Sequence, residues 1–296
     1  MMKLGRLLTA MVTPFDEKGG VNYKQARRLA AALLDSGTEG LVVAATTGES
    51  PTLLRKEELR LFTEVKSIVG ERAAVIANTG SNSTAEALEA TKVAEKIGVD
   101  ACLLVVPYYN KPTQEGLYQH FKVVAESTRL PCIIYNVPSR TVINLSADTV
   151  IRLSQIDNIV GIKEASGNME QVSRIISDAR DGFRIWSGND SDTFAILTMG
   201  GYGVVSVASH LVGNQIREMI DSVIGGRVDE AARSHHRLMP LINSLFIVTN
   251  PMPVKYALSY IGFNVGKPRL PLTDPDEKSV ALIKNTLKSY KIDLPV

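Results

Sequence analysis

Short apolar runs alternate with longer amphipathic stretches along most of the chain. The runs are rich in β-branched residues and are typical of buried strands, whereas the stretches between them have the spacing of amphipathic helices. The predicted strands are Leu7–Val12, Leu41–Ala45, Ala73–Asn78, Ala101–Val106, Cys132–Asn136, Ile159–Lys163, Phe183–Ser187 and Gly203–Val207. The predicted helices between and after them occupy residues 22–37, 55–70, 83–97, 113–127, 146–154, 168–180, 190–199 and 213–225.

Strand and helix alternate eight times in this pattern, which predicts an α/β fold, a (β/α)₈ TIM barrel. The alternative is a doubly wound open sheet, but such a sheet usually has fewer strands and a single switch point. After residue 225 the strand-like runs stop, and three further helices are predicted at 227–247, 253–261 and 276–292, with Pro251, Pro253 and Pro275 near their starts. We therefore expect a barrel over residues 1–225 and a C-terminal three-helix appendage over residues 226–296.

Local signals mark several predicted helix ends. Ser83 and Ser146 each precede a helical stretch with an early acidic residue, which is the pattern of an N-cap. Gly98, Gly182 and Gly225 stand where helices are expected to stop.

The composition is that of an ordinary globular protein, with 45% hydrophobic and 22% charged residues in a chain of 296. The formal net charge of +2, without a basic run, gives no nucleic-acid or membrane footprint, so we expect a small-molecule partner. No apolar run has the length of a membrane span, and the N-terminal pattern is not that of a signal peptide. We expect a cytoplasmic protein in which Cys102 and Cys132 are buried free thiols.

Several familiar motifs are incomplete in this chain. Gly201-Tyr-Gly203 lacks the third glycine of a dinucleotide fingerprint and precedes a strand, whereas the fingerprint follows one. Gly262–Lys267 is one residue short of a phosphate-binding loop, and Pro268 replaces its hydroxyl residue. The adjacent His235 and His236 would diverge on a helix, and neither an HExxH nor a GxSxG motif is present. We expect no cofactor and no metal site.

Lys163 is the most informative polar residue of the predicted strands. In a barrel, the side chains at the carboxyl ends of the strands converge on one mouth. Alternation places Ile159, Gly161 and Lys163 on one face, and if that face points inward the lysine enters the mouth. Partial desolvation there favours the neutral amine, which attacks carbonyl groups. The alternative is a solvated lysine at a strand end.

Other strand ends also carry polar groups. Tyr135 ends the fifth strand, where a hydroxyl can pass protons, and Arg140 follows in the loop with a fork that suits a carboxylate. Thr46–Ser50 could hold a small anion through hydroxyl and backbone N–H groups. Plainer alternatives exist for these residues: Tyr135 could be an aromatic residue at the rim of the barrel, and Thr46–Ser50 could be a capped loop. Two further strand ends carry polar residues as well: the tyrosines of Pro107–Pro112 could mark a subunit contact, and Ser187–Asp190 could form a turn.

The combination of Thr46-Thr-Gly-Glu49, Tyr135-Asn-Val-Pro138 and Gly161-Ile-Lys-Glu164 resembles the dihydrodipicolinate synthase and N-acetylneuraminate lyase superfamily. Its members are class I pyruvate aldolases on a (β/α)₈ barrel. The resemblance covers essentially the whole chain, including Asn250-Pro-Met-Pro-Val-Lys255. Within this superfamily, the chain resembles the synthase branch, which is distinguished by an arginine at the position of Arg140 and by a loop like Pro107–Pro112. Ala45 departs from the glycine usual before Thr46, and its methyl group fits if φ is negative there.

The resemblance implies a role for each motif residue. Lys163 would form a Schiff base with pyruvate, while Tyr135, Thr46 and a neighbouring subunit's Tyr109 would form a proton relay. Thr47 would bind the carboxylate of pyruvate, and Arg140 that of aspartate semialdehyde. Gly188 and Val205 would line the pocket. The implied assembly is a homotetramer of tight dimers.

The implied reaction condenses pyruvate with aspartate semialdehyde in lysine and diaminopimelate biosynthesis. The nearest alternative is another pyruvate aldolase that uses Lys163, such as an N-acetylneuraminate lyase or a keto-deoxy sugar acid aldolase. Arg140 argues against a sugar, because a polyol makes less use of its charge. A third hypothesis is a non-catalytic barrel that senses a keto acid, against which the full set of reactive residues argues.

Lysine-inhibited relatives have an effector pocket at the tight-dimer interface. The matching positions are Ser50, Pro51, Arg55, Glu58, Asn82, Glu86 and Tyr108. Arg55 and Glu58 replace histidines common there. A cation beside the ammonium group of lysine is unfavourable, although Glu58 could compensate, so we expect weak or absent inhibition by lysine.

Overall fold

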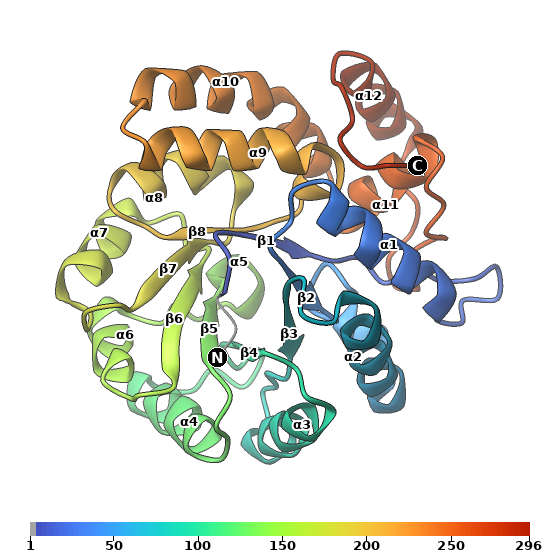
Figure 1. Cartoon of the computed structure of the whole chain (residues 1–296). Helices are drawn as coiled ribbons and strands as arrows, with labels where there is room; N and C mark the ends of the chain where they lie inside the picture. The colour runs from blue at the N-terminus through green and yellow to red at the C-terminus, as the bar shows by residue number, and fades with distance from the viewer. Residues whose placement is uncertain (1–3) are drawn as a thin grey trace. The chain divides into compact units, whose positions relative to one another are not determined.

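The computed structural model describes residues 4–296 and contains a closed parallel barrel whose strands follow one another in chain order (Figure 1). The predicted (β/α)₈ fold is therefore confirmed. The strands are β1 (Leu7–Ala10), β2 (Gly40–Val43), β3 (Ala74–Asn78), β4 (Ala101–Val105), β5 (Cys132–Asn136), β6 (Ile159–Glu164), β7 (Arg184–Ser187) and β8 (Gly203–Ser206). Their residues are almost all buried, as expected of strands covered on both faces.

Helices follow each strand along the chain. Those of the barrel are α1 (Tyr23–Asp35), α2 (Arg55–Val69), α3 (Thr84–Ile97), α4 (Gln114–Glu126), α5 (Pro138–Thr141), α6 (Ala147–Ser154), α7 (Met169–Asp178), α8 (Thr193–Thr198) and α9 (Ser209–Ile224), with short 3₁₀ turns η1 (Ser50–Thr52) and η2 (Asp190–Asp192). The C-terminal helices are α10 (Val228–Leu245), α11 (Met252–Tyr260) and α12 (Glu277–Leu287). All three predicted C-terminal helices are present. Among the described residues, no helix is both long and apolar enough to cross a membrane.

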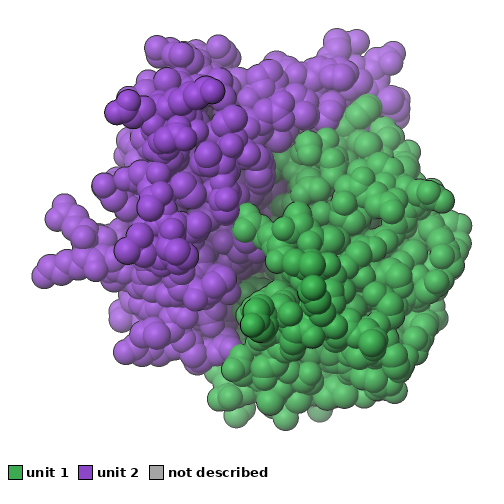
Figure 2. Space-filling model, turned by 180° about the vertical axis from the view of Figure 1, so that it is seen from behind, with its two compact units in different colours: residues 1, 76–205 green, residues 2–75, 206–296 purple. Residues whose placement is uncertain are grey.

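The chain forms two compact units, which Figure 2 distinguishes by colour. In the part of the chain that is described, unit 1 comprises residues 76–205, and unit 2 combines residues 4–75 with residues 206–296. Unit 2 therefore brings the beginning and the end of the chain into one body. The predicted division at residues 225 and 226 separates the barrel elements from the additional helices, and it does not coincide with these units.

Most predicted elements are present, with differences at their ends. Helix α5 was not expected, because four residues are too few to show a helical period. Helix α9 begins at Ser209 rather than 213, since its first turn is joined to the rest across non-helical Val212. The stop expected at Gly182 was wrong: α7 ends at Asp178 with Ala179 as its C-cap.

The predicted caps and buried thiols are observed. Ser83 and Ser146 each accept a backbone N–H bond at the start of their helix, and Gly98 ends α3 in the left-handed conformation. Cys102 and Cys132 are buried and free, and burial raises the pKa of Cys102 to about 12. These thiols therefore act as small apolar groups that pack in unit 1.

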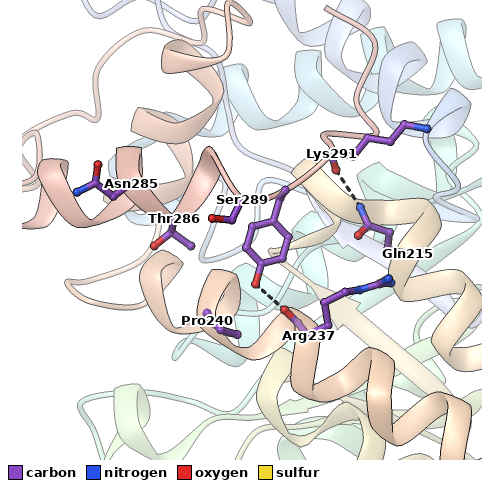
Figure 3. Close-up of a pocket in the computed structure, with 8 residues that line it drawn as sticks. Gln215, Arg237, Pro240, Asn285, Thr286, Ser289 and Lys291 are labelled. Carbon is purple, nitrogen blue, oxygen red and sulfur yellow. Dashed lines mark hydrogen bonds between the residues drawn. The ribbon is translucent and has the colours of Figure 1, made fainter.

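The C-terminal part of unit 2 contains a pocket of about 680 Å³ (Figure 3). Across it, the Tyr290 hydroxyl donates to the Arg237 carbonyl, and Gln215 Nε2 donates to the Lys291 carbonyl at 2.9 Å. These bonds attach the final segment of the chain to α9 and α10. None of the residues predicted to act on a substrate lines this pocket.

Candidate active site

Lys163 lies near the carboxyl end of β6 in unit 1 and is 4% exposed. It is paired in register with Tyr135 of the neighbouring β5, and its Nζ lies 4.0 Å from the centre of the tyrosine ring. Among the described residues, no carboxylate forms an ion pair with Nζ. A buried amine without a carboxylate partner is suited to nucleophilic attack on a carbonyl group.

The direction of Lys163 follows from its neighbour. Glu164 accepts hydrogen bonds from Asn136 Nδ2 at 3.1 Å and from Gln171 Nε2 of α7 at 3.3 Å. Its side chain therefore points toward the helices around the sheet. Because successive strand residues face opposite sides, Lys163 lies on the inner face of the sheet, which is the condition under which the sequence pattern leads it into the barrel mouth.

Sequence reasoning missed the polar network around Glu164. The Ser166 N–H donates to the Glu164 carboxylate at 2.7 Å, and Asn136 Nδ2 also donates to Asn144 Oδ1 at 2.8 Å. Burial raises the pKa of Glu164, while its hydrogen bonds oppose this shift. The network joins the ends of β5 and β6 one residue beyond Tyr135 and Lys163, so it fixes the backbone that carries both side chains.

Two glycines in unit 1 allow the backbone to pack closely beside Lys163. A Cβ atom at Gly161 would lie 2.2 Å from the Arg184 carbonyl oxygen and 2.7 Å from a ring carbon of Trp186. A Cβ atom at Gly188 would lie 2.7 Å from that of Ala165. Any larger residue would therefore push β6 and β7 apart.

The other candidate residues of unit 1 differ in exposure. Arg140 is exposed on α5, which starts with Pro138 directly after β5. Tyr109 is 89% exposed and adopts a left-handed backbone conformation with φ of 72°. Val205 is buried in β8. Within a single chain, Tyr109 is thus presented outward, whereas Lys163 and Tyr135 are enclosed.

The threonine pair lies in unit 2, in the loop after β2. Thr46 is partly exposed and Thr47 is 3% exposed. In this loop Ala44 and Glu49 have positive φ angles, of 52° and 58°, whereas Ala45 does not. The methyl group of Ala45 therefore meets no backbone strain, as expected. Thr47 Oγ1 accepts a hydrogen bond from Asn250 Nδ2 at 2.9 Å.

A buried ion pair anchors the same loop to the C-terminal helices and was not predicted. Lys255 Nζ of α11 lies 2.7 Å from Glu49 Oε1, and the two side chains are 1% and 0% exposed. Nζ also donates to the Thr13 and Lys267 carbonyls, and the Arg269 N–H donates to Glu49 Oε2. One signal of this pair was present, since both Glu49 and Lys255 belong to the motifs that carry the family resemblance.

The predicted effector positions are divided between the units. In unit 2, Arg55 donates to Glu58 at 2.8 Å, and burial raises the pKa of Glu58 to about 7. In unit 1, the Ser81 hydroxyl donates to Glu86, and Asn110 Nδ2 donates to the Asn82 carbonyl. Ser50 and Pro51 lie in η1, and Tyr108 is 41% exposed. The Arg55 guanidinium is thus already paired with the carboxylate of Glu58.

A buried lysine beside a tyrosine at the strand ends of a parallel (β/α)₈ barrel lies where barrel enzymes carry their active sites, and a buried amine is suited to forming a Schiff base. Residues 3–290 match the model of the dihydrodipicolinate synthetase family, and the chain belongs to that family.

Relatives agree with this assignment. The chain is 64% identical, over the full length of both proteins, to the 4-hydroxy-tetrahydrodipicolinate synthase of Dehalococcoides mccartyi. The crystal structure of the Cyanidioschyzon merolae enzyme with lysine bound is 46% identical, with a TM-score of 0.96, and the match covers 98% of this chain and 99% of that one. The chloride-inhibited dihydrodipicolinate synthase of Acinetobacter baumannii, complexed with pyruvate, is 39% identical, with a TM-score of 0.94 and coverage of 97% and 99%.

Proposed function

We propose that the chain is a lyase that condenses pyruvate with L-aspartate-4-semialdehyde to 4-hydroxy-tetrahydrodipicolinate, in the biosynthesis of diaminopimelate and lysine. The full-length identity to named synthases supports the reaction. The observation that carries the chemistry is Lys163, a buried amine against the Tyr135 ring with no carboxylate paired to it among residues 4–296.

The reaction begins when Lys163 Nζ attacks the keto carbon of pyruvate. Loss of water gives an imine, and its protonated form acidifies the adjacent methyl group. Removal of a methyl proton produces an enamine, whose carbon attacks the aldehyde carbon of the semialdehyde while the aldehyde oxygen gains a proton. The amine of the second substrate then displaces Lys163, which closes the ring and regenerates the enzyme. The iminium accepts the electron pair, so the sequence of steps needs no metal or cofactor.

Hydroxyl groups move the protons in this scheme. Tyr135 is the central member, because its ring already contacts Lys163 Nζ and its hydroxyl can both accept and donate a proton. Thr46 and a neighbouring subunit's Tyr109 complete the relay. The outward presentation of Tyr109 supports a role across a subunit boundary.

The two substrate carboxylates have separate partners. Thr47 binds the carboxylate of pyruvate, and Arg140 binds that of the semialdehyde, for which an exposed guanidinium at the strand end is suited. Gly188 and Val205 line the pocket. With a net charge of only +2, attraction of two anionic substrates depends on such local groups.

We further propose a cytoplasmic homotetramer built from tight dimers. Inhibition by lysine should be weak or absent, because Arg55 places a cation in the predicted effector site and Glu58 is already paired with it. Inhibition at micromolar lysine would contradict this expectation.

A related aldolase activity is the alternative. An N-acetylneuraminate lyase or keto-deoxy sugar acid aldolase would share the Schiff base on Lys163 but would place a polyol beside Arg140. Comparing condensation of pyruvate and aspartate semialdehyde with cleavage of N-acetylneuraminate distinguishes the two. Turnover of either kind eliminates a non-catalytic keto-acid sensor.

Borohydride trapping tests the chemistry directly. Reduction in the presence of pyruvate should attach the three-carbon unit to Lys163, and peptide mass mapping should locate it there. Lys255 is the internal control, because it is equally buried but its ammonium group is hydrogen-bonded to Glu49 and two carbonyls. Absence of an adduct on Lys163, or its presence on Lys255 instead, would overturn the mechanism.

A further inference from the structure

The hydrogen bond between Asn250 and Thr47 has a defined direction. The Asn250 amide is oriented with Nδ2 toward Thr47 Oγ1, 2.9 Å away, so in this orientation Thr47 accepts the hydrogen bond. Both side chains are buried, at 6% and 3% exposure. A hydroxyl group has one proton to donate, and here that proton is not used in the bond to Asn250. The amide thus leaves Thr47 as a donor, which is what an anionic ligand requires.

A hydroxyl that accepts one hydrogen bond also becomes a stronger donor in another, since neighbouring bonds in a low-dielectric environment polarise each other. The hydrogen bond from Asn250 therefore favours binding of a substrate carboxylate to the hydroxyl proton of Thr47. A carboxylate at position 250 would have the opposite effect, because it would accept the hydrogen bond from the Thr47 hydroxyl and repel an anionic ligand.

Further hydrogen bonds hold the loop that carries Thr47. The Thr13 hydroxyl donates to the Gly48 carbonyl at 2.6 Å, and Glu49 adopts a left-handed conformation with φ of 58°. Its carboxylate is fixed by Lys255 Nζ and by the Arg269 N–H. The strained backbone at Glu49 thus coincides with its buried anchor, as expected where surrounding contacts impose an unfavourable conformation.

We propose that Asn250 and Lys255 are positioning residues for the keto-acid substrate. Asn250 directs the Thr47 hydroxyl proton toward the carboxylate of pyruvate, and the Lys255–Glu49 pair fixes the loop at the position where this contact forms. The inference rests on the proposed function, in which Thr47 binds that carboxylate, and it adds two residues of the C-terminal region to substrate recognition.

Substitutions at Asn250 test the direction of the bond. Asn250→Ala removes the donor and should raise the KM for pyruvate about fivefold, the usual effect of one neutral hydrogen bond. Asn250→Asp, in which the new side chain has nearly the same shape, should raise the KM for pyruvate by a further factor of about ten, because the carboxylate accepts the hydrogen bond that Thr47 would otherwise donate to pyruvate. The KM for aspartate semialdehyde should stay within about twofold of its original value.

The effect of Asn250 should act through Thr47. In a Thr47→Val background, Asn250→Ala should therefore change the KM for pyruvate by less than about twofold. An equal effect with and without the Thr47 hydroxyl would overturn the assignment, as would an Asn250→Asp variant no worse than Asn250→Ala. This cycle uses only the alanine variant, so it decides the question even if the aspartate variant does not fold.

The Lys255–Glu49 pair is tested by removing both charges together in Lys255→Met/Glu49→Gln, which leaves no unpaired buried ion. The KM for pyruvate should rise at least about fivefold, whereas a general loss of active enzyme would lower kcat alone. Lys267→Met is the matched control, because its exposed ammonium pairs with Asp274 and its carbonyl bond to Lys255 is retained. A folded double variant with an unchanged KM would refute the role of the pair.

Failure of the proposed function is distinguishable from failure of this inference. If the unmodified protein neither traps pyruvate on Lys163 nor condenses the two substrates, the function itself is wrong. If it does both and the Asn250 variants bind pyruvate normally, only the positioning role is wrong.

Discussion

Replacing Lys255 with methionine should destabilise the protein more than any surface substitution. The change removes the bond from Nζ to Glu49 at 2.7 Å, together with those to the carbonyls of Thr13 and Lys267. Nζ also lies 4.1 Å from the centre of the Phe15 ring. What remains is a carboxylate that is 0% exposed and keeps one hydrogen bond, from the Arg269 N–H.

The expected loss is about 3–5 kcal/mol in the free energy of unfolding, the typical cost of leaving one member of a buried ion pair without its partner. Glu49→Gln alone should also be costly, because Lys255 then keeps its charge among carbonyl groups. The double variant should lose markedly less free energy of unfolding than the two single variants lose together, and the difference, the coupling energy, should be at least about 2 kcal/mol. Buried charges that are removed together leave no uncompensated ion.

Urea denaturation of the four proteins in this cycle, followed by circular dichroism, measures the coupling. Lys267→Met again serves as control, since its exposed ion pair should be worth less than about 1 kcal/mol. Additive single effects, with a coupling below about 0.5 kcal/mol, would refute the argument that these two charges depend on each other.

Further predictions concern the site and its surroundings. Tyr135→Phe should lower kcat by roughly 10²–10³-fold in the condensation assay, and an unchanged rate would exclude Tyr135 from the relay. Arg140→Ala should raise the KM for aspartate semialdehyde more than that for pyruvate, and equal increases would contradict its role. Gly161→Ala should cost more than about 2 kcal/mol in urea denaturation, because its Cβ atom would overlap the Arg184 carbonyl oxygen. Burial raises the pKa of Glu58 to about 7, so the folded state retains a proton that the unfolded state has lost. Stability should therefore fall as the pH rises from about 4.5 to about 7, by up to about 3 kcal/mol, and Glu58→Gln should remove this decline.

The eight strands could be predicted because each is a short apolar run in a sheet covered on both faces. Their ends were less accurate: β1 stops at Ala10 and β2 at Val43, where the ladder ends although the apolar residues continue. Hydropathy reports burial, and residues beyond the ladder are buried as well. The four residues of α5 are set by Pro138 and the local chain direction, which leave no periodic signal.

The candidate site divides in a similar way. Lys163 and Tyr135 could be found because a polar group that ends an apolar strand is visible in the local sequence. The contacts of Asn250 and Lys255 could not, since their partners Thr47 and Glu49 lie more than 200 positions away, and nothing in the local sequence indicates the pairing.

Unit 2 combines two segments that are far apart in the chain, and this separation affects the order in which its parts become available during synthesis on the ribosome. Residues 4–75 are made before unit 1, yet the other part of their compact unit, residues 206–296, is made after it. Unit 1, a continuous segment, can collapse while the chain is still growing, whereas the Thr47 loop must wait for Asn250 and Lys255 to emerge. A chain released before residue 250 would thus contain Lys163 without the contacts that hold the Thr47 loop. Under the proposed function, binding of the keto acid would therefore depend on a residue that is translated 203 positions after Thr47.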